Sequence, residues 1–135
     1  IRSEVYGILQ REDTLKEIVR LLGPEALPDE EKLILEVARM IKIGLLQQNS
    51  FDDVDTYCSP EKQFKLMKLL VDFYKQGQQA IKEGTPLSDI RAMSSITSIL
   101  KARMDIKDDE MPKLDQLSTD MEKEFKSITG VKVSN

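Results

Sequence analysis

The spacing of apolar residues, divided by proline and glycine, is the feature that most constrains this fold. Apolar side chains recur every three to four residues in most segments, the spacing that places them on one face of an α-helix. Proline is tolerated in the first turn of a helix and disrupts its interior, so a proline pair marks a helix boundary. Such pairs are Gly23–Pro24, Ser59–Pro60, Thr85–Pro86 and Met111–Pro112.

This pattern predicts an all-α fold, a single domain over residues 1–135 in which about five helices with short loops form an antiparallel helical bundle. The first helix ends at Gly23, the second begins with Asp29 as its N-cap, the third ends near Gly84, and the last ends at Gly130. The residues expected to face the core are, helix by helix, Leu15, Ile18, Val19 and Leu22; Ile34, Val37, Ile41 and Leu45; Phe64, Met67, Val71, Tyr74 and Ile81; Ile90, Met93, Ile96 and Leu100; and Leu114, Leu117, Met121, Phe125 and Ile128.

Composition excludes several classes of function. The chain has no histidine, which removes Ser-His-Asp and Cys-His catalysis and His-containing zinc sites. It also lacks the G-x-x-x-x-G-K-S/T motif of a phosphate-binding loop. A net charge of -4 with interleaved signs offers no basic surface for nucleic acid, and no apolar run is long enough to cross a bilayer. The single cysteine, Cys58, suits a reducing compartment and a buried, inert thiol.

Two acidic runs resemble metal sites only superficially. Asp52–Asp55 and Asp105–Glu110 lack the spacing of a calcium-binding loop. We interpret the first run as solvated carboxylates or helix caps, and the second as acidic residues at the favourable positive end of the last helix. We therefore expect no metal site and no catalytic residue in this chain.

Two other features remain open on physical grounds alone. GPEALPDEEKL, residues 23–33, has more prolines and carboxylates than a plain helix connection needs. Phe51 is a large apolar residue in the polar loop that follows Gln47. It is either an anchor in the domain's own core or an aromatic ring presented to a flat ligand or partner.

Three segments carry a resemblance to a known family: LQREDTLKEIVRLLGPEALPDEEKLILEVARMI, LLQQNSFDDVDTYCSPEKQFKLMKLLVDFY and EGTPLSDI. From about Leu9 to about Ile90 the chain resembles the C-terminal domain of the catalytic A subunit of archaeal A-type and V-type rotary ATPases. The resemblance implies that the chain is a fragment of a longer nucleotide-binding subunit. Residues 1–8 would then connect it to the preceding domain, and ATP or ADP with Mg²⁺ would bind in that domain, not in this fragment.

The resemblance also suggests a role for the segment from Gly23 to Leu33. Related subunits carry an acidic segment here that bears on the central rotating shaft, which implies rotor contacts for Glu25, Asp29, Glu30 and Glu31. Pro24 and Pro28 depart from the related pattern and would stiffen the elbow. A purely structural elbow is the alternative.

A second role is implied for the loop after Gln47. In the family an aromatic residue of this loop closes over the adenine of the bound nucleotide, and Phe51 occupies the matching position. Gln48 and Ser50 would line the edge of the same site. Stacking of this kind supports affinity more than base specificity.

The expected function is therefore mechanical: the domain couples ATP synthesis or hydrolysis in the adjacent domain to rotor movement and to proton or sodium transport. The implied partners are the nucleotide-binding domain of its own chain, the central rotor stalk and the non-catalytic B subunit. Its location would be cytoplasmic, peripheral to the membrane and in contact with it only through the assembled complex. The alternative is a free-standing helical adaptor that binds partner helices. A phosphate-binding motif upstream in the parent gene would decide between the two.

Overall fold

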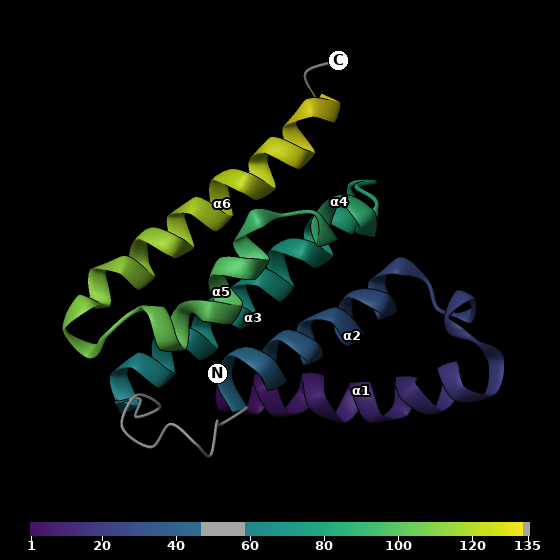
Figure 1. The fold of residues 1–135 in the computed structure, drawn as a ribbon. Coiled ribbons are helices and arrows are strands. Elements are labelled where there is room, and N and C mark those ends of the chain that lie inside the picture. The colour runs from purple at the N-terminus through teal and green to yellow at the C-terminus, as the bar shows by residue number, and fades with distance from the viewer. Residues whose placement is uncertain (47–58, 134–135) are drawn as a thin grey trace.

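The structure, a computed structural model, describes residues 1–46 and 59–133, and it confirms the all-α fold (Figure 1). The described residues contain no strand. The α-helices are α1 (Arg2–Leu22), α2 (Asp29–Ile41), α3 (Pro60–Lys82), α4 (Leu87–Arg91), α5 (Ser94–Asp105) and α6 (Met111–Val133). Short 3-10 helices, η1 (Pro24–Ala26) and η3 (Asp108–Glu110), precede α2 and α6, and a π-helix, η2 (Lys42–Leu46), continues α2.

The first three helices pack in chain order, and the later helices pack back onto them. α1 and α2 form an antiparallel hairpin that turns at η1, and α2 packs in turn on α3 (Figure 1). α6 packs on α3 and α5, and α5 packs on η2. The hairpin turn at η1 lies at one extremity of the molecule, well away from the N-terminus (Figure 1). No helix of the described part is long and apolar enough to cross a membrane.

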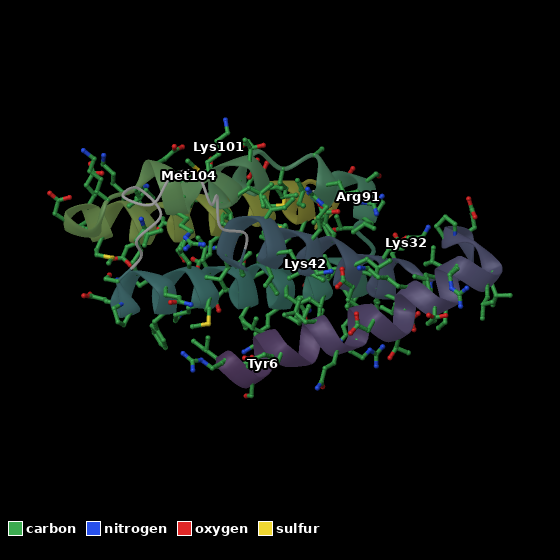
Figure 2. The ribbon with its side chains drawn as sticks, turned by 60° about the horizontal axis from the view of Figure 1, so that its bottom comes forward. Tyr6, Lys32, Lys42, Arg91, Lys101 and Met104 are labelled. Carbon is green, nitrogen blue, oxygen red and sulfur yellow. The ribbon has the colours of Figure 1, made fainter. Side chains whose placement is uncertain are left out.

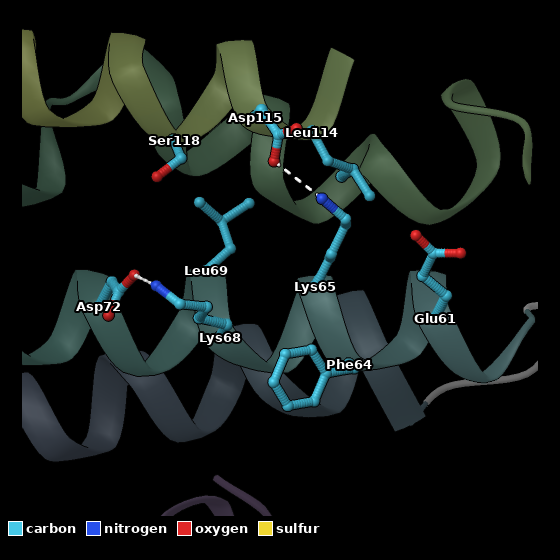
Figure 3. Close-up of a pocket in the computed structure, with 9 residues that line it drawn as sticks. All are labelled: Glu61, Phe64, Lys65, Lys68, Leu69, Asp72, Leu114, Asp115 and Ser118. Atoms are coloured by element: carbon cyan, nitrogen blue, oxygen red, sulfur yellow. Dashed lines mark hydrogen bonds and ion pairs between the residues drawn. The ribbon is translucent and has the colours of Figure 1, made fainter. Parts of the chain in front are cut away.

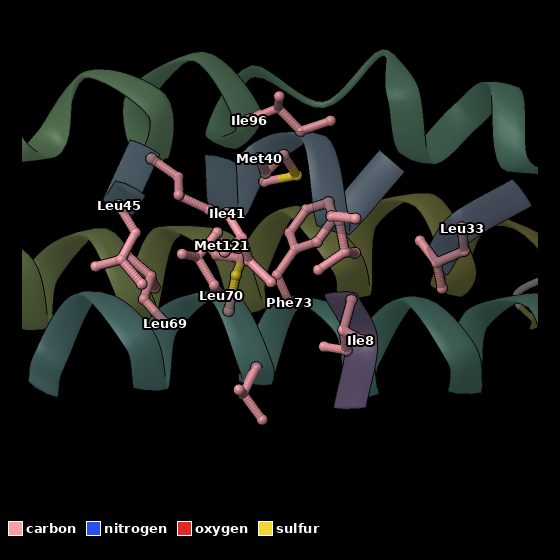
Figure 4. Packing of buried hydrophobic residues seen from close by; sticks show 14 of the residues in the cluster. Ile8, Leu33, Met40, Ile41, Leu45, Leu69, Leu70, Phe73, Ile96 and Met121 are labelled. Atoms are coloured by element: carbon pink, nitrogen blue, oxygen red, sulfur yellow. The ribbon is translucent and has the colours of Figure 1, made fainter. Parts of the chain in front are cut away.

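A single apolar core joins these helices (Figure 4). Its centre contains Phe73 of α3, whose ring lies 5.3 Å from that of Phe125 of α6. Gly77 of α3 packs directly against Leu33, since a Cβ added at Gly77 would lie only 3.0 Å from the Cδ2 atom of Leu33. Tight packing of this kind fixes how the hairpin sits on the rest of the domain.

Most residues expected in the core are buried or packed against it, but the predictions for Leu22 and Phe64 are wrong. Leu22 is 72% exposed because it ends α1, where no other helix covers it. Phe64 is 50% exposed because α3 turns a different face inward. The buried face of α3 includes residues that the sequence analysis did not single out: Leu66, Leu69, Leu70, Phe73, Gly77 and Ala80.

The predicted helix boundaries are partly correct. Ser59 caps α3 as expected, since its hydroxyl accepts from the Lys62 amide at 3.2 Å. Pro28, not Asp29, is the N-cap of α2. The predicted fourth helix is broken at Met93 into α4 and α5, and α6 continues through Gly130 to Val133.

Candidate functional site

The elbow between α1 and α2, residues 23–31, is the first candidate site. α1 ends at Gly23, whose φ of 90° is a left-handed conformation that suits glycine. The Gly23 amide still donates to the Val19 carbonyl at 2.8 Å. Pro24 then begins the turn of η1, in which the Leu27 amide donates to the Pro24 carbonyl at 3.2 Å. Backbone hydrogen bonds therefore order both the end of α1 and the turn of η1.

Leu27 and Pro28 attach this turn to the domain. The Leu27 side chain is only 5% exposed and belongs to the core. Pro28 is extended, with φ of -69° and ψ of 165°, and its carbonyl accepts from the Glu31 and Lys32 amides at 3.0 Å each. The two prolines fix φ, and the buried leucine anchors the segment between them. The elbow is thus held by two prolines and a buried side chain, which a plain helix connection does not require.

The four carboxylates proposed from the sequence lie on this elbow in different surroundings. Glu25 on η1 and Glu30 in the first turn of α2 are exposed, whereas Asp29 and Glu31 are half-buried. The Asp29 carboxylate accepts from the Leu87 amide at 3.2 Å, so it ties the elbow to the start of α4. The structure therefore presents Glu25 and Glu30 outward and gives Asp29 an internal partner.

Sequence reasoning missed an exposed apolar pair immediately before the elbow. Leu21 and Leu22, the last two residues of α1, are each 72% exposed. Behind them, the Arg20 guanidinium pairs with Glu17 at 2.6 Å. The signal that could have found the pair was its position immediately before Gly23–Pro24, because the last residues of a helix can extend past the helices that pack on it.

The second candidate region, Gln48, Ser50 and Phe51, lies outside the described residues, as do Asp52–Asp55 and Cys58. The flanks of this segment are described. Arg103 of α5 donates from Nη1 to the Leu45 carbonyl at 2.8 Å, at the end of η2. On the other flank Lys62 donates from Nζ to the Arg103 carbonyl at 2.6 Å and also to the Ile106 carbonyl. The last turn of α5 thus holds both flanks.

An ion pair fixes η2 to α1. Glu12 is buried, and its carboxylate lies 2.6 Å from the Lys42 ammonium and 3.6 Å from that of Lys16. Lys42 extends from the end of α2 beside α1 (Figure 2). The hydrogen bond to Glu12 raises the pKa of Lys42 and so keeps it charged. This pairing makes Glu12 and Lys42 structural.

No group of three or more His, Cys, Asp or Glu residues in the described ranges could hold a metal ion. In the second acidic run, Glu110 pairs with Lys113 and accepts from the Lys107 amide at 3.0 Å. The Lys113 hydrogen bond is the main reason that the pKa of Glu110 is lowered. Glu110 thus caps η3, the 3-10 helix that precedes α6.

A groove between α3 and α6 has a volume of about 420 Å³ (Figure 3). Four of the charged groups that line it form two pairs, Lys65 with Asp115 and Lys68 with Asp72, each at 3.0 Å. Phe64 lies at its edge. Because these charges satisfy each other, the groove presents no set of convergent polar groups for a small ligand.

The fold and the elbow define an all-helical domain whose projecting acidic hairpin is suited to contact a macromolecular partner. Within that class the family is shown by comparison with known proteins. The chain belongs to the family described as the C-terminal domain of V and A type ATP synthase, which matches residues 1–91.

Individual relatives agree with this assignment. The chain is 44% identical over 118 residues to the A subunit of the A-type ATP synthase of Ignicoccus hospitalis, covering 86% of this chain and 20% of that protein. It is 42% identical over 130 residues to the A subunit of the A-type ATP synthase of Sulfolobus acidocaldarius, covering 95% of this chain and 22% of that protein. The chain thus spans about a fifth of the length of these relatives.

Proposed function

We propose that this domain transmits the nucleotide state of a preceding catalytic domain to the central rotor of a rotary ATP synthase. Family membership supports the parent protein, and one observation carries the mechanical role: an acidic elbow with two prolines at the extremity of the α1–α2 hairpin. In this proposal the parent subunit makes or hydrolyses ATP, and this domain carries no catalytic residue.

The hairpin is suited to act as a lever. α1 has 21 residues, and a helix rises about 1.5 Å per residue, so its ends lie about 30 Å apart. A small rotation at the start of α1 therefore moves the elbow through a larger arc. α2 packs along both α1 and α3, which keeps the hairpin from bending on its own.

The elbow residues have two different roles in this proposal. Glu25, Glu30 and the half-buried Glu31 face the rotor, and Asp29 supports the elbow through its bond to the Leu87 amide. Pro24 and Pro28 limit the backbone freedom that would otherwise absorb the motion.

Contact with the nucleotide is assigned to the loop after Gln47, not to the elbow. We assign Phe51 to stacking on the adenine of ATP or ADP held with Mg²⁺ in the preceding domain, with Gln48 and Ser50 at the edge. Residues 1–8 make the connection to that domain, and since α1 begins at Arg2 the connection continues directly into the lever. The partners are that domain, the rotor stalk and the non-catalytic B subunit, in a soluble head on the cytoplasmic side that reaches the membrane only through the complex.

The adenine contact is tested in the full-length subunit with Phe51→Ala. Base stacking contributes about 1–3 kcal/mol, so the variant should bind ATP about 5- to 150-fold more weakly. Inorganic tripolyphosphate, which has no base, should bind equally well to both proteins. Equal loss for both ligands, or a lower melting temperature with unchanged ATP affinity, would assign Phe51 to the core instead.

A further inference from the structure

Leu21 and Leu22 form an exposed apolar end on α1 that the domain itself does not use. Each is 72% exposed, and they are the only sequence neighbours among the large apolar residues exposed in the described part of the chain. Adjacent helical residues point about 100° apart, so two exposed neighbours present a broad apolar surface. We call these two residues the leucine tip.

The leucine tip lies within an acidic stretch of the chain, residues 17–31, whose charged residues we call the acidic rim. Residues 17–31 contain five acidic residues and one basic residue, Arg20, which is paired with Glu17. Glu25 lies on η1, three residues after Leu22, and is exposed, as is Glu30. An apolar centre with a charged rim is the usual anatomy of a protein interface. The acidic rim calls for a partner surface that is basic around an apolar centre.

The position of the leucine tip restricts which partner can cover it. It ends α1, about 30 Å from Ile1, where the domain that precedes this family in its relatives would join. The elbow also lies at an extremity of the molecule (Figure 1). The leucine tip therefore lies at the opposite end of α1 from that junction.

We propose that Leu21 and Leu22 make the principal contact of the elbow, and that their partner is a helical surface with apolar side chains between basic ones. This inference rests on the proposed function, in which that partner is the central rotor. Apolar contact is non-directional, so it tolerates sliding better than a set of fixed ion pairs. The carboxylates of the acidic rim then attract the basic partner, and the leucine tip makes the apolar contact with it.

The partner is identified by placing a photo-crosslinking amino acid at residue 22, and separately at residue 25, of the full-length subunit in the assembled complex. We expect both positions to crosslink to the rotor. If residue 25 reaches the rotor and residue 22 reaches only the B subunit, the preceding domain or nothing, the leucine-tip proposal is wrong and the proposed function stands. If neither position reaches the rotor, both fail.

The chemistry of the contact is tested by rotor affinity at low and high salt. Leu21→Gln/Leu22→Gln preserves helix propensity and should weaken rotor binding about 10- to 100-fold at both salt concentrations. Glu25→Gln/Glu30→Gln should weaken it only at low salt, because salt screens exposed charges. Tyr6→Gln and Met104→Gln, at other exposed apolar positions, are the matched controls and should bind normally. Unchanged affinity of the double leucine variant, with helicity retained, would overturn the proposal.

Discussion

At the scale of single residues, two charged side chains hold helix ends in place. Lys62 is 3% exposed, and its ammonium serves the carbonyls at the end of α5. Glu124 of α6 serves the start of α5, where its carboxylate accepts from the Ser94 amide at 2.7 Å and the Ser95 amide at 2.9 Å. Because α5 has no side-chain cap of its own, both of its ends depend on other helices.

Glu124 should make stability depend on pH. Burial favours its protonated form, but the hydrogen bonds from Ser95 and Ser94 outweigh this and lower its pKa below the ordinary 4.5. The stabilisation is therefore complete above pH 4.5 and is lost as pH falls through the lower pKa of the folded state. We expect Glu124→Ala to cost about 1–2 kcal/mol at pH 7, measured by urea unfolding. Glu124→Gln should reduce the acid-induced loss, and an unchanged pH profile would exclude this role.

Lys62 offers a second test at this scale. Lys62→Met keeps the length of the side chain but leaves two buried carbonyls without their donor. The expected loss is about 1–3 kcal/mol in the free energy of unfolding. Lys68→Met, on the exposed side of the same helix, is the control and should change stability by less than about 0.5 kcal/mol. Equal effects of the two variants would contradict this account.

At the scale of elements, the sequence predicted the helix boundaries that depend on local signals. It did not predict the features that depend on contacts between distant helices. Gly23 and the proline pairs indicated helix boundaries because glycine and proline act on their own backbone. Asp29 was predicted to be the N-cap of α2, a position that Pro28 holds. The bond that the Asp29 carboxylate does make, to the Leu87 amide, joins residues far apart in the sequence and could not be predicted. Leu22 was assigned to the core because periodicity does not show where the neighbouring helix ends.

The contact between α2 and α3 is predicted to be intolerant of bulk at Gly77. Valine there would bring new atoms against Leu33, which is fully buried, and overpacking typically costs about 1–3 kcal/mol. Gly7→Val is the matched control, because a Cβ at Gly7 meets nothing within 4 Å. Thermal unfolding should separate the two variants. Equal melting temperatures would show that the two helices can move apart freely.

At the scale of the whole molecule, the all-α class and the order of the helices could be predicted from apolar spacing. The break between α4 and α5 could not, because Glu124 from a distant helix supports the start of α5. The candidate site was only partly predictable. Its exposed carboxylates were found from charge and position, whereas the leucine tip required knowing which surfaces the fold leaves uncovered.

The isolated chain should fold without acting on ATP. It contains the helical core but no phosphate-binding motif, so we expect a cooperative helical unfolding transition together with neither ATP hydrolysis nor tight ATP binding. Circular dichroism and titration calorimetry measure these properties. Tight binding of ATP to this chain alone would refute the assignment of nucleotide binding to a preceding domain.

The central claim is that a stiff elbow carries motion from the catalytic domain to the rotor. The most direct measurement is torque during ATP-driven rotation in complexes rebuilt with Pro24→Gly/Pro28→Gly, compared with alanine variants of Glu25, Asp29, Glu30 and Glu31. ATP hydrolysis by the rotor-free complex and thermal stability of the domain serve as controls. We predict that the double glycine variant loses torque while it keeps rotor-free hydrolysis, because its flexible backbone absorbs the motion, and that the alanine variants lose little. Normal torque from the glycine variant with stalled alanine variants would contradict the account and favour a contact specific to charge.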